Sequence, residues 1–553
     1  MENTRRWADV RPSADLARKY RQLSFWRDAT PAEDLRRWAR ETPDAVAISA
    51  HTAAAGTRRM TYREYAGQVE RVTAVLAECG IGPGDVVALQ LPNWWQLNAV
   101  VLACARLGAI AAPFVPTIRA RELELMLSRL EPVAYVTTEV WDGYEHAAAL
   151  ASIAGRLPAI KHRIIVGGHA AAGEIDLDQR IEQVPASTLG ITQKAADSAE
   201  DPDRVSIVLF TSGTTGAPKA VLHSFNTFYA SYRPTGVRVG LSSPDVLFTP
   251  HAAGHVLGLH MANMLPLYLG AQAFISDTWD PEASADLLAE HRVTFVIGAP
   301  VFIEAIAGAA RRQHLQLPWL RHVNATATTV PASLVAAVRE DLGRILESGW
   351  GMTETGGAAL TSAGEDPPDW AARSVGRPFE CMEADLRSDG EVSPRTPARL
   401  FVRGANVCLA TMPRDGREVT VFADGQDGAW YDTGDLVVPD GRGGLRMAGR
   451  AADRIGGAFM IPAADVEDAL RGHPDIDDAA LVGYGPANQL PCAVIVSQRP
   501  LTLDEVRGYL DGIGMTAWYQ PQRLEVVDQM PRNSTGKVDK HGLRTWLATV
   551  DSA

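Results

Sequence analysis

The chain has 553 residues, of which 46% are hydrophobic and 22% charged, so it is long enough for two or three packed domains and too apolar for extensive disorder. Its formal net charge of −13 is spread without long blocks of one sign, which argues against binding to nucleic acid or to an anionic membrane. The five cysteines form no CxxC pair, so we expect neither a disulfide framework nor a zinc site.

The amino terminus is charged and lacks the apolar segment of a secretory signal. The most apolar stretch, Val100–Pro116, is short and contains Arg106, so it predicts a buried helix running into a strand rather than a membrane span. We therefore expect a cytoplasmic protein without a membrane span.

Helical patterns alternate with short β-branched runs over most of the chain. A helix expected over Leu123–Leu130 precedes a strand over Val133–Thr137. The run Val205–Phe210 predicts a strand that stops at a Gly/Thr-rich turn, and a helix over Ala283–His291 precedes a strand over Val293–Gly298. This alternation predicts an α/β fold with mixed, largely parallel sheets covered by helices.

The pattern changes near residue 440, where Pro439–Gly444 is a strong turn signal. We place a boundary close behind it, between a large N-terminal domain (1–449) and a small, mobile α+β domain (450–553). The small domain is expected to contain a helix at Asp465–Arg471, strands at Ala479–Gly483 and Ala493–Val496, and a helix at Leu503–Gly512.

The segment Thr211–Lys219 reads Thr-Ser-Gly-Thr-Thr-Gly-Ala-Pro-Lys and directly follows a predicted strand. Glycines let backbone N–H groups converge on an anion, hydroxyls add donors, and Lys219 adds a cation. Pro218 opposes a helix directly behind the loop, which separates it from the nucleotide loop that runs into a helix. The segment predicts a polyphosphate site.

This loop resembles the phosphate loop of the adenylate-forming superfamily, which includes acyl-CoA synthetases, aryl-CoA ligases, firefly luciferase and peptide-synthetase adenylation domains. The resemblance covers nearly the whole chain and points to the acyl-CoA ligase branch, loosely to cyclohexanecarboxylate- or medium-chain-type ligases. Four further segments match family motifs in the family's order: Gly349–Glu354, Tyr431–Asp435, Gly449-Arg450 and Pro531–Lys537.

The resemblance implies ATP or AMP, Mg²⁺ and coenzyme A as cofactors. Glu354 would be the Mg²⁺ ligand, Thr353 would donate to the α-phosphate, and Lys537 would stabilise charge in the adenylation transition state. The β- and γ-phosphates would be held by the loop residues Thr211, Ser212, Gly213, Thr214, Thr215, Gly216 and Lys219.

The same resemblance assigns the rest of the adenylate site. Asp435 would accept hydrogen bonds from both ribose hydroxyls, and Arg450 would bind ribose or phosphate oxygens. A histidine, His251 or His255, is expected at the acid-binding site. The adenine or acyl group would be flanked by Ala327, Trp350, Gly351 and Met352.

The chain departs from the family at several positions. Ala452 replaces a polar hinge residue, and the loop behind it is one residue shorter. The usual Gly-Gly-Ala-Pro under the adenine becomes Ala325–Thr328, and a lysine common before Pro521 is absent, leaving Trp518-Tyr519-Gln520. An altered hinge could bias the two orientations of the small domain that the family uses.

The leading hypothesis is an acyl-CoA ligase that activates a hydrophobic carboxylic acid through its acyl-adenylate. One alternative is an uncoupled enzyme that performs a single half-reaction, such as CoA transfer onto a preformed adenylate. Another is a non-catalytic adenylate-binding protein. The expected partners are the acid or its adenylate and coenzyme A, with a carrier protein as the less favoured acceptor and a homodimer as an open alternative.

Overall fold

The structure is a computed structural model, and it describes all residues except 1–5, 186–199, 214–215, 328–329, 389, 394–396, 414–418, 426, 451–454, 456–460, 462, 486–487, 532–537 and 551–553. Within helices and strands, some positions are described for their backbone only: 6, 212, 213, 216, 217, 449, 450, 464, 465, 468 and 541.

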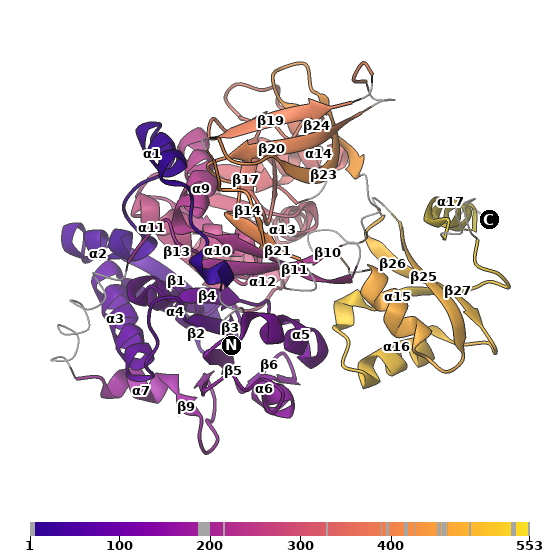
Figure 1. The fold of residues 1–553 in the computed structure, drawn as a ribbon. Helices are drawn as coiled ribbons and strands as arrows, with labels where there is room; N and C mark the ends of the chain where they lie inside the picture. The colour runs from indigo at the N-terminus through magenta and orange to yellow at the C-terminus, as the bar shows by residue number, and fades with distance from the viewer. Residues whose placement is uncertain are drawn as a thin grey trace.

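Two nine-stranded sheets form the larger part of the molecule (Figure 1). The strands of the first sheet are, in spatial order, β18 (Arg377–Pro378), β17 (Gly356–Leu360), β16 (Leu346–Met352), β15 (His322–Ala325), β14 (Phe295–Gly298), β12 (Val246–Phe248), β13 (Gln272–Ser276), β1 (Val46–Thr52) and β2 (Gly56–Thr61). Those of the second are β22 (Thr420–Val421), β21 (Ala410–Met412), β11 (Gly216–His223), β10 (Ile207–Gly213), β4 (Ile110–Pro113), β3 (Val86–Gln90), β5 (Ala134–Thr138), β8 (His162–Val166) and β9 (Ile175–Asp176).

The central strands of both sheets pair in parallel. Antiparallel pairs lie at both edges of the first sheet and at the β22 edge of the second, whose β9 edge is parallel. The parallel strands are buried on both faces and rich in apolar residues, as in β3 (VVALQ) and β14 (FVIG). The predicted fold class, mixed and largely parallel sheets covered by helices, is therefore confirmed. The covering helices are α2 (Pro31–Glu41), α3 (Tyr62–Glu78), α4 (Trp95–Leu107), α5 (Ala120–Leu130), α6 (His146–Ala154), α7 (Leu177–Gln183), α9 (Phe225–Val239), α10 (Val256–Leu259), α11 (Leu265–Leu269), α12 (Pro281–Glu290), α13 (Pro300–Arg312) and α14 (Ala332–Leu342).

Most of the predicted elements are confirmed within a few residues. Val100–Pro116 is indeed a buried helix, α4, that runs into strand β4. The predicted end of the strand Val205–Phe210 is wrong, because β10 continues to Gly213 and pairs with β11 in a hairpin. Backbone hydrogen bonds to β11 keep the Gly/Thr segment extended, with Thr211 opposite Lys219.

A four-stranded sheet packs beside the two large ones. It consists of β19 (Met382–Arg387), β20 (Ala398–Gly404), β23 (Tyr431–Pro439) and β24 (Leu445–Arg450). The predicted turn at Pro439–Gly444 is the tip of the β23–β24 hairpin within this sheet.

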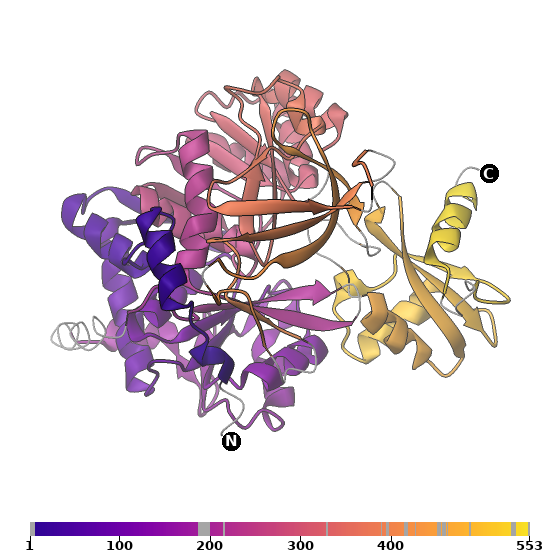
Figure 2. The same cartoon turned by 45° about the horizontal axis from the view of Figure 1, so that its top comes forward.

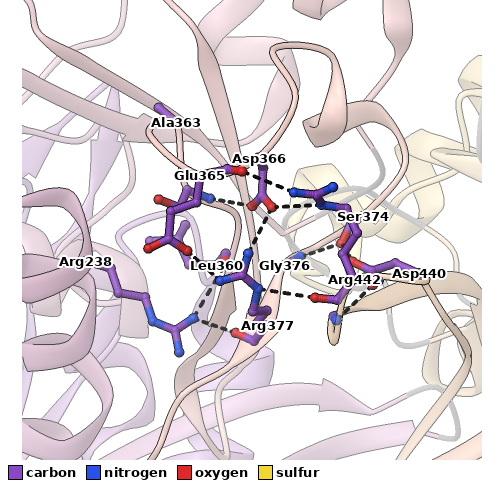
Figure 3. A network of polar contacts seen from close by, with 12 residues as sticks. Arg238, Leu360, Ala363, Glu365, Asp366, Ser374, Gly376, Arg377, Asp440 and Arg442 are labelled. Carbon is purple, nitrogen blue, oxygen red and sulfur yellow. Dashed lines mark hydrogen bonds and ion pairs between the residues drawn. The ribbon is translucent and has the colours of Figure 1, made fainter.

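Figure 3 shows how the connection between β17 and β18 is fastened to that hairpin. Arg377 contacts both Glu365 (2.6 Å) and Asp366 (3.2 Å), and its Nε donates to the carbonyl of Arg442. Ser374 donates to Asp440 over 2.6 Å. These contacts hold the 361–376 connection against the sheet that carries β23.

The C-terminal part forms a three-stranded sheet with helices, drawn in yellow beside the larger body (Figures 1 and 2). Its elements are α15 (Ala463–Arg471), β25 (Ile476–Tyr484), β26 (Leu490–Ser497), α16 (Leu503–Gly512), β27 (Arg523–Val526) and α17 (Lys540–Val550). The α+β pattern expected for this region is confirmed, whereas the boundary at 449/450, at the end of β24, stays a prediction.

One polar contact joins the C-terminal part to helix α5. The fully buried hydroxyl of Thr516 donates to the carboxylate of Glu122 over 3.0 Å and accepts from the backbone N–H of Arg119 over 3.2 Å. Thr516 therefore couples the position of the small sheet to the first turn of α5. None of the helices in the described part of the chain has the length and apolar composition needed to cross a bilayer.

Candidate active site

A cavity of about 700 Å³ opens where the sheets and the C-terminal part meet. It is lined by ends of β4, β10, β11, β14, β15, β16, β17 and β23, by α10, and by Trp518 and Tyr519. Its lining includes the predicted site residues Thr211, Lys219, His255, Ala327, Trp350, Gly351, Met352, Thr353 and Glu354. Segments far apart in the sequence thus converge on one space of the size expected for a small-molecule site.

The described residues of the predicted phosphate loop belong to the β10–β11 hairpin. Thr211 and Lys219 face each other across the ladder and both line the cavity. Ser212, Gly213 and Gly216 belong to the hairpin strands by their backbone, and Thr214 and Thr215 lie outside the described residues.

Lys219, Tyr431 and Glu354 form a closed polar cluster at the cavity. The Lys219 ammonium forms an ion pair with the buried Glu354 carboxylate and donates to the Tyr431 hydroxyl over 2.7 Å. The same hydroxyl donates to Glu354 over 2.8 Å. Burial by itself raises the pKa of Glu354, but the Lys219 charge and these hydrogen bonds outweigh it and hold that pKa below its ordinary value.

Thr353 is positioned by a buried histidine. The Nε2 of His223 lies 2.8 Å from the Thr353 carbonyl oxygen, and its Nδ1 lies 2.9 Å from the Thr227 hydroxyl. Burial lowers the pKa of His223 to about 4, so the ring is neutral near pH 7 and its Nε2–H donates to that carbonyl. His223 therefore acts on the backbone of the site, not on the cavity.

The predicted ribose acceptor also lies at the site. The indole Nε1 of Trp350 donates to the buried carboxylate of Asp435 over 3.0 Å. Asp435 and Arg450 are Cα partners in the β23–β24 ladder, so their backbones are neighbours, although the Arg450 side chain is not described. Lys537 and the rest of its motif from residue 532 onwards lie outside the described residues.

The altered adenine segment follows β15. Ala325 packs into a hydrophobic core and not toward the cavity, whereas Thr326 and Ala327 line the cavity. The Thr326 hydroxyl donates to the carbonyl of Gly349 over 3.0 Å. Ala327 has φ of +75°, a strained conformation for a residue with a Cβ, and such strain is often stored at functional sites.

The two candidate histidines differ. His255 lines the cavity, and its ring accepts from the backbone N–H of Leu257 over 3.3 Å. His251 stacks on His255 with ring centroids 5.8 Å apart and accepts from the N–H of Ala299 over 3.1 Å, but it is not among the cavity-lining residues that the structure describes. Burial lowers the pKa of His251 to about 3, so it is neutral.

Sequence reasoning missed three cavity residues. Tyr431 is the first residue of the Tyr431–Asp435 motif, but no sequence pattern indicates that its hydroxyl joins Lys219 to Glu354. His260 lies on a π-helical turn, His260–Met264, and a break of this kind often marks a functional site. Asn324 is fully buried in β15, and its position beside the altered adenine segment was the available signal.

The site offers one carboxylate, that of Glu354, as a ligand for Mg²⁺. Glu354 is held by Lys219, which fills the place of a cation beside it. The described residues contain no group of three or more His, Cys, Asp or Glu side chains suited to a metal ion. A single carboxylate suits Mg²⁺ that takes its other ligands from phosphate and water.

Family models match both parts of the chain. The model described as AMP-binding enzyme matches residues 35–410, and the AMP-binding enzyme C-terminal domain matches residues 465–537.

Individual relatives are similar over nearly their full length. A medium-chain fatty-acid–CoA ligase of Escherichia coli is 29% identical, with 95% of this chain and 92% of the relative covered. A Mycobacterium tuberculosis CoA ligase named for a methyl-dioxo-octahydroindenyl propanoyl group is 30% identical, with 92% and 97% covered. Among solved structures, the amide bond synthetase McbA from Marinactinospora thermotolerans has a TM-score of 0.78 at 24% identity, with 94% and 99% covered.

Proposed function

Because the chain belongs to the AMP-binding enzyme family and is an adenylate-forming acid–thiol ligase, we propose that it activates a hydrophobic carboxylic acid with ATP and transfers the acyl group to coenzyme A. The observation that carries the proposal is one cavity lined by Thr211 and Lys219 of the phosphate hairpin, by Thr353-Glu354 and by Trp350, whose indole N–H binds Asp435. Apolar residues around that cavity, such as Met261 and Phe379, support a hydrophobic acid.

The chemistry assigned to the site starts from a poor acyl donor. A carboxylate becomes reactive once it is joined to AMP, and pyrophosphate leaves. Lys219 and the hairpin N–H groups would bind the β- and γ-phosphates, Thr353 the α-phosphate, and Asp435 the ribose. When bound, Mg²⁺ would supply charge neutralisation on the phosphates, with Glu354 as its protein ligand.

The proposal extends to the C-terminal part. We assign residues 450–553 the role of a small domain that changes orientation between the half-reactions, with Lys537 entering the site only for adenylation. The Thr516 contact with α5 would then belong to one of the two orientations. Trp518 and Tyr519 would close the mouth of the cavity in that orientation.

Two assays separate this proposal from its alternatives. Pyrophosphate exchange with a panel of free acids measures adenylation, and thioester formation from synthetic acyl-adenylates measures transfer. We expect both reactions with coenzyme A as acceptor. Transfer without exchange would replace the proposal with an uncoupled transferase, and tight adenylate binding with neither reaction would replace it with a binding protein.

The variant Lys537→Ala tests whether Lys537 acts in adenylation alone. Loss of one group that stabilises transition-state charge costs about 10²–10³ in rate, so exchange should fall by that factor. Transfer from a preformed adenylate should change little. An equal loss of both reactions would contradict the assignment of Lys537 to adenylation alone.

A further inference from the structure

Part of the cavity has apolar walls. Side chains from α10, the adjoining π-helical turn, β14, β17 and the residue after β18 line it: Val256, Leu257, Met261, Ile297, Leu360 and Phe379. Such walls bind a hydrocarbon body by burial but provide no hydrogen bond.

Asn324 is a polar exception in this part of the cavity. Its side chain is fully buried in β15 and lines the cavity. Neither its Oδ1 nor its Nδ2 has a hydrogen-bond partner among the described residues. A buried polar group left without a partner destabilises the fold, so proteins rarely keep one unless something else pairs with it.

Gly349 makes room beside the buried Asn324 amide. A Cβ built at Gly349 would lie 3.6 Å from Asn324 Oδ1, so the glycine leaves open the space next to the amide. Ala325, the next residue of the strand, points to the opposite face and into a core.

A second buried polar group lies beside Asn324. Glu347 in β16 is its Cα partner in the parallel ladder and therefore projects from the same face of the sheet. One Glu347 oxygen accepts from the N–H of Ala363 over 3.1 Å, and the other has no partner among the described residues. Ala363 belongs to the connection that Figure 3 shows fastened by Arg377 and Asp366.

We propose that Asn324 selects an acid whose apolar body carries a hydroxyl or keto oxygen. The Asn324 Nδ2 would donate to that oxygen, and a hydroxyl would in turn donate to Oδ1. The inference rests on the proposed function, because it names the class of acid that the same cavity takes. A plain hydrocarbon acid would leave the amide unpaired in the complex and would bind less tightly for that reason.

The test uses matched pairs of acids. Cyclohexanecarboxylate, decanoate and naphthoate are each compared with derivatives that carry one ring or chain hydroxyl or ketone. Their non-hydrolysable acyl-sulfamoyl adenosine analogues are compared by calorimetry, which needs no turnover. We expect at least one oxygenated member to exceed its plain partner by about tenfold or more in kcat/KM and in affinity.

Two variants separate selection from a structural role. Asn324→Leu should remove the preference, bring the ratio within each pair close to one, and leave the thermal midpoint equal or higher because an unpaired amide is gone. Asn324→Ser, which keeps a hydroxyl, should retain part of the preference. The matched control is Asn263→Leu, since Asn263 is also buried with both amide atoms unpartnered among the described residues but does not line the cavity.

The outcomes distinguish the two proposals. If the wild type turns over no acid and binds no analogue, the proposed function fails. If it turns over acids but prefers no oxygenated member, or if Asn324→Leu changes both members of each pair equally, only the role of Asn324 fails. An equal change of the ratio in Asn263→Leu would also overturn that role.

Discussion

The two halves of the cavity differ in how their polar groups are satisfied. In the nucleotide half, Lys219, Tyr431 and Glu354 pair with one another, and Trp350 binds Asp435. In the acyl half, Asn324 has no partner among the described residues. Under the proposed function, a nucleotide would have to exchange these existing contacts, whereas an acid with a suitable oxygen would add a new one. The affinity for a nucleotide would then equal the free energy of its new contacts minus that of the contacts it breaks. An oxygenated acid would gain a hydrogen bond without breaking one.

The largest effect is expected when the ion pair between Lys219 and Glu354 is removed. Lys219→Met leaves the buried Glu354 carboxylate without its counter-charge, and such a loss costs about 3–5 kcal/mol. We expect the free energy of unfolding to fall by an amount near the lower end of that range, because the hydrogen bond from Tyr431 to Glu354 remains. Urea denaturation at neutral pH measures this fall. The double variant Lys219→Met/Glu354→Gln should recover most of the loss, and additive losses would contradict the pairing.

Glu347, the neighbour of Asn324 in the sheet, is a buried carboxylate whose protonation can be tested. Burial raises the pKa of Glu347 to about 7 from an ordinary value near 4.5. The folded protein therefore holds the proton more tightly than the unfolded chain. Its contribution to stability is complete below about pH 4.5 and declines as the pH rises toward 7, by up to ~3 kcal/mol.

Glu347→Gln should remove this decline. We expect the variant to gain stability relative to the wild type as the pH is raised from 5 to 8, as measured by thermal or urea unfolding at each pH. Glu365→Gln, which changes an exposed carboxylate of the same connection, is the control and should show no comparable gain. A constant difference across the range would mean that Glu347 does not titrate there.

Tyr431→Phe tests the hydroxyl that joins the nucleotide cluster. Removal of one hydrogen-bonding group is worth about 1–1.5 kcal/mol, so pyrophosphate exchange should fall about tenfold. Thioester formation from a preformed adenylate should be nearly unchanged, since the cluster is assigned to the polyphosphate. A larger loss in transfer than in exchange would contradict that division.

The smallest effect is expected at the contact between the C-terminal part and α5. Thr516→Val keeps the volume but removes the bonds to Glu122 and Arg119. A shift of about 1 kcal/mol between orientations changes the ratio of exchange to transfer roughly fivefold. The direction identifies which half-reaction uses this orientation, and an unchanged ratio would show that the contact does not select between orientations.

Much of the fold could be predicted from local patterns. Helix α16 and the run from α4 into β4 follow from apolar spacing, and capping residues set many helix starts, such as Thr502 with Glu505. The end of β10 could not be predicted in this way, because pairing with β11 keeps the Gly/Thr segment extended against its local turn preference.

The candidate site likewise contains residues that motifs predict and residues whose roles depend on tertiary contacts. Thr353, Glu354 and Asp435 stand in motifs, and the structure brings them to one cavity or to a residue that lines it. The roles of Tyr431 and His223 depend on contacts between residues more than 75 positions apart, which no local pattern records. The choice of His255 over His251 as the cavity-lining residue likewise depends on packing.

The sequence by itself determined the family and the fold class, since motif spacing and hydrophobic period are local properties of the chain, and the same motifs predict the residues of the nucleotide site. The tertiary structure alone decided which polar groups are paired. Lys219 in β11 of one large sheet meets Glu354 in the turn between β16 and β17 of the other. Asn324 has no partner among the described residues because β15 turns it into an apolar wall beside a glycine. Pairing and burial are set by distances between remote segments, and those distances exist only once the sheets have packed.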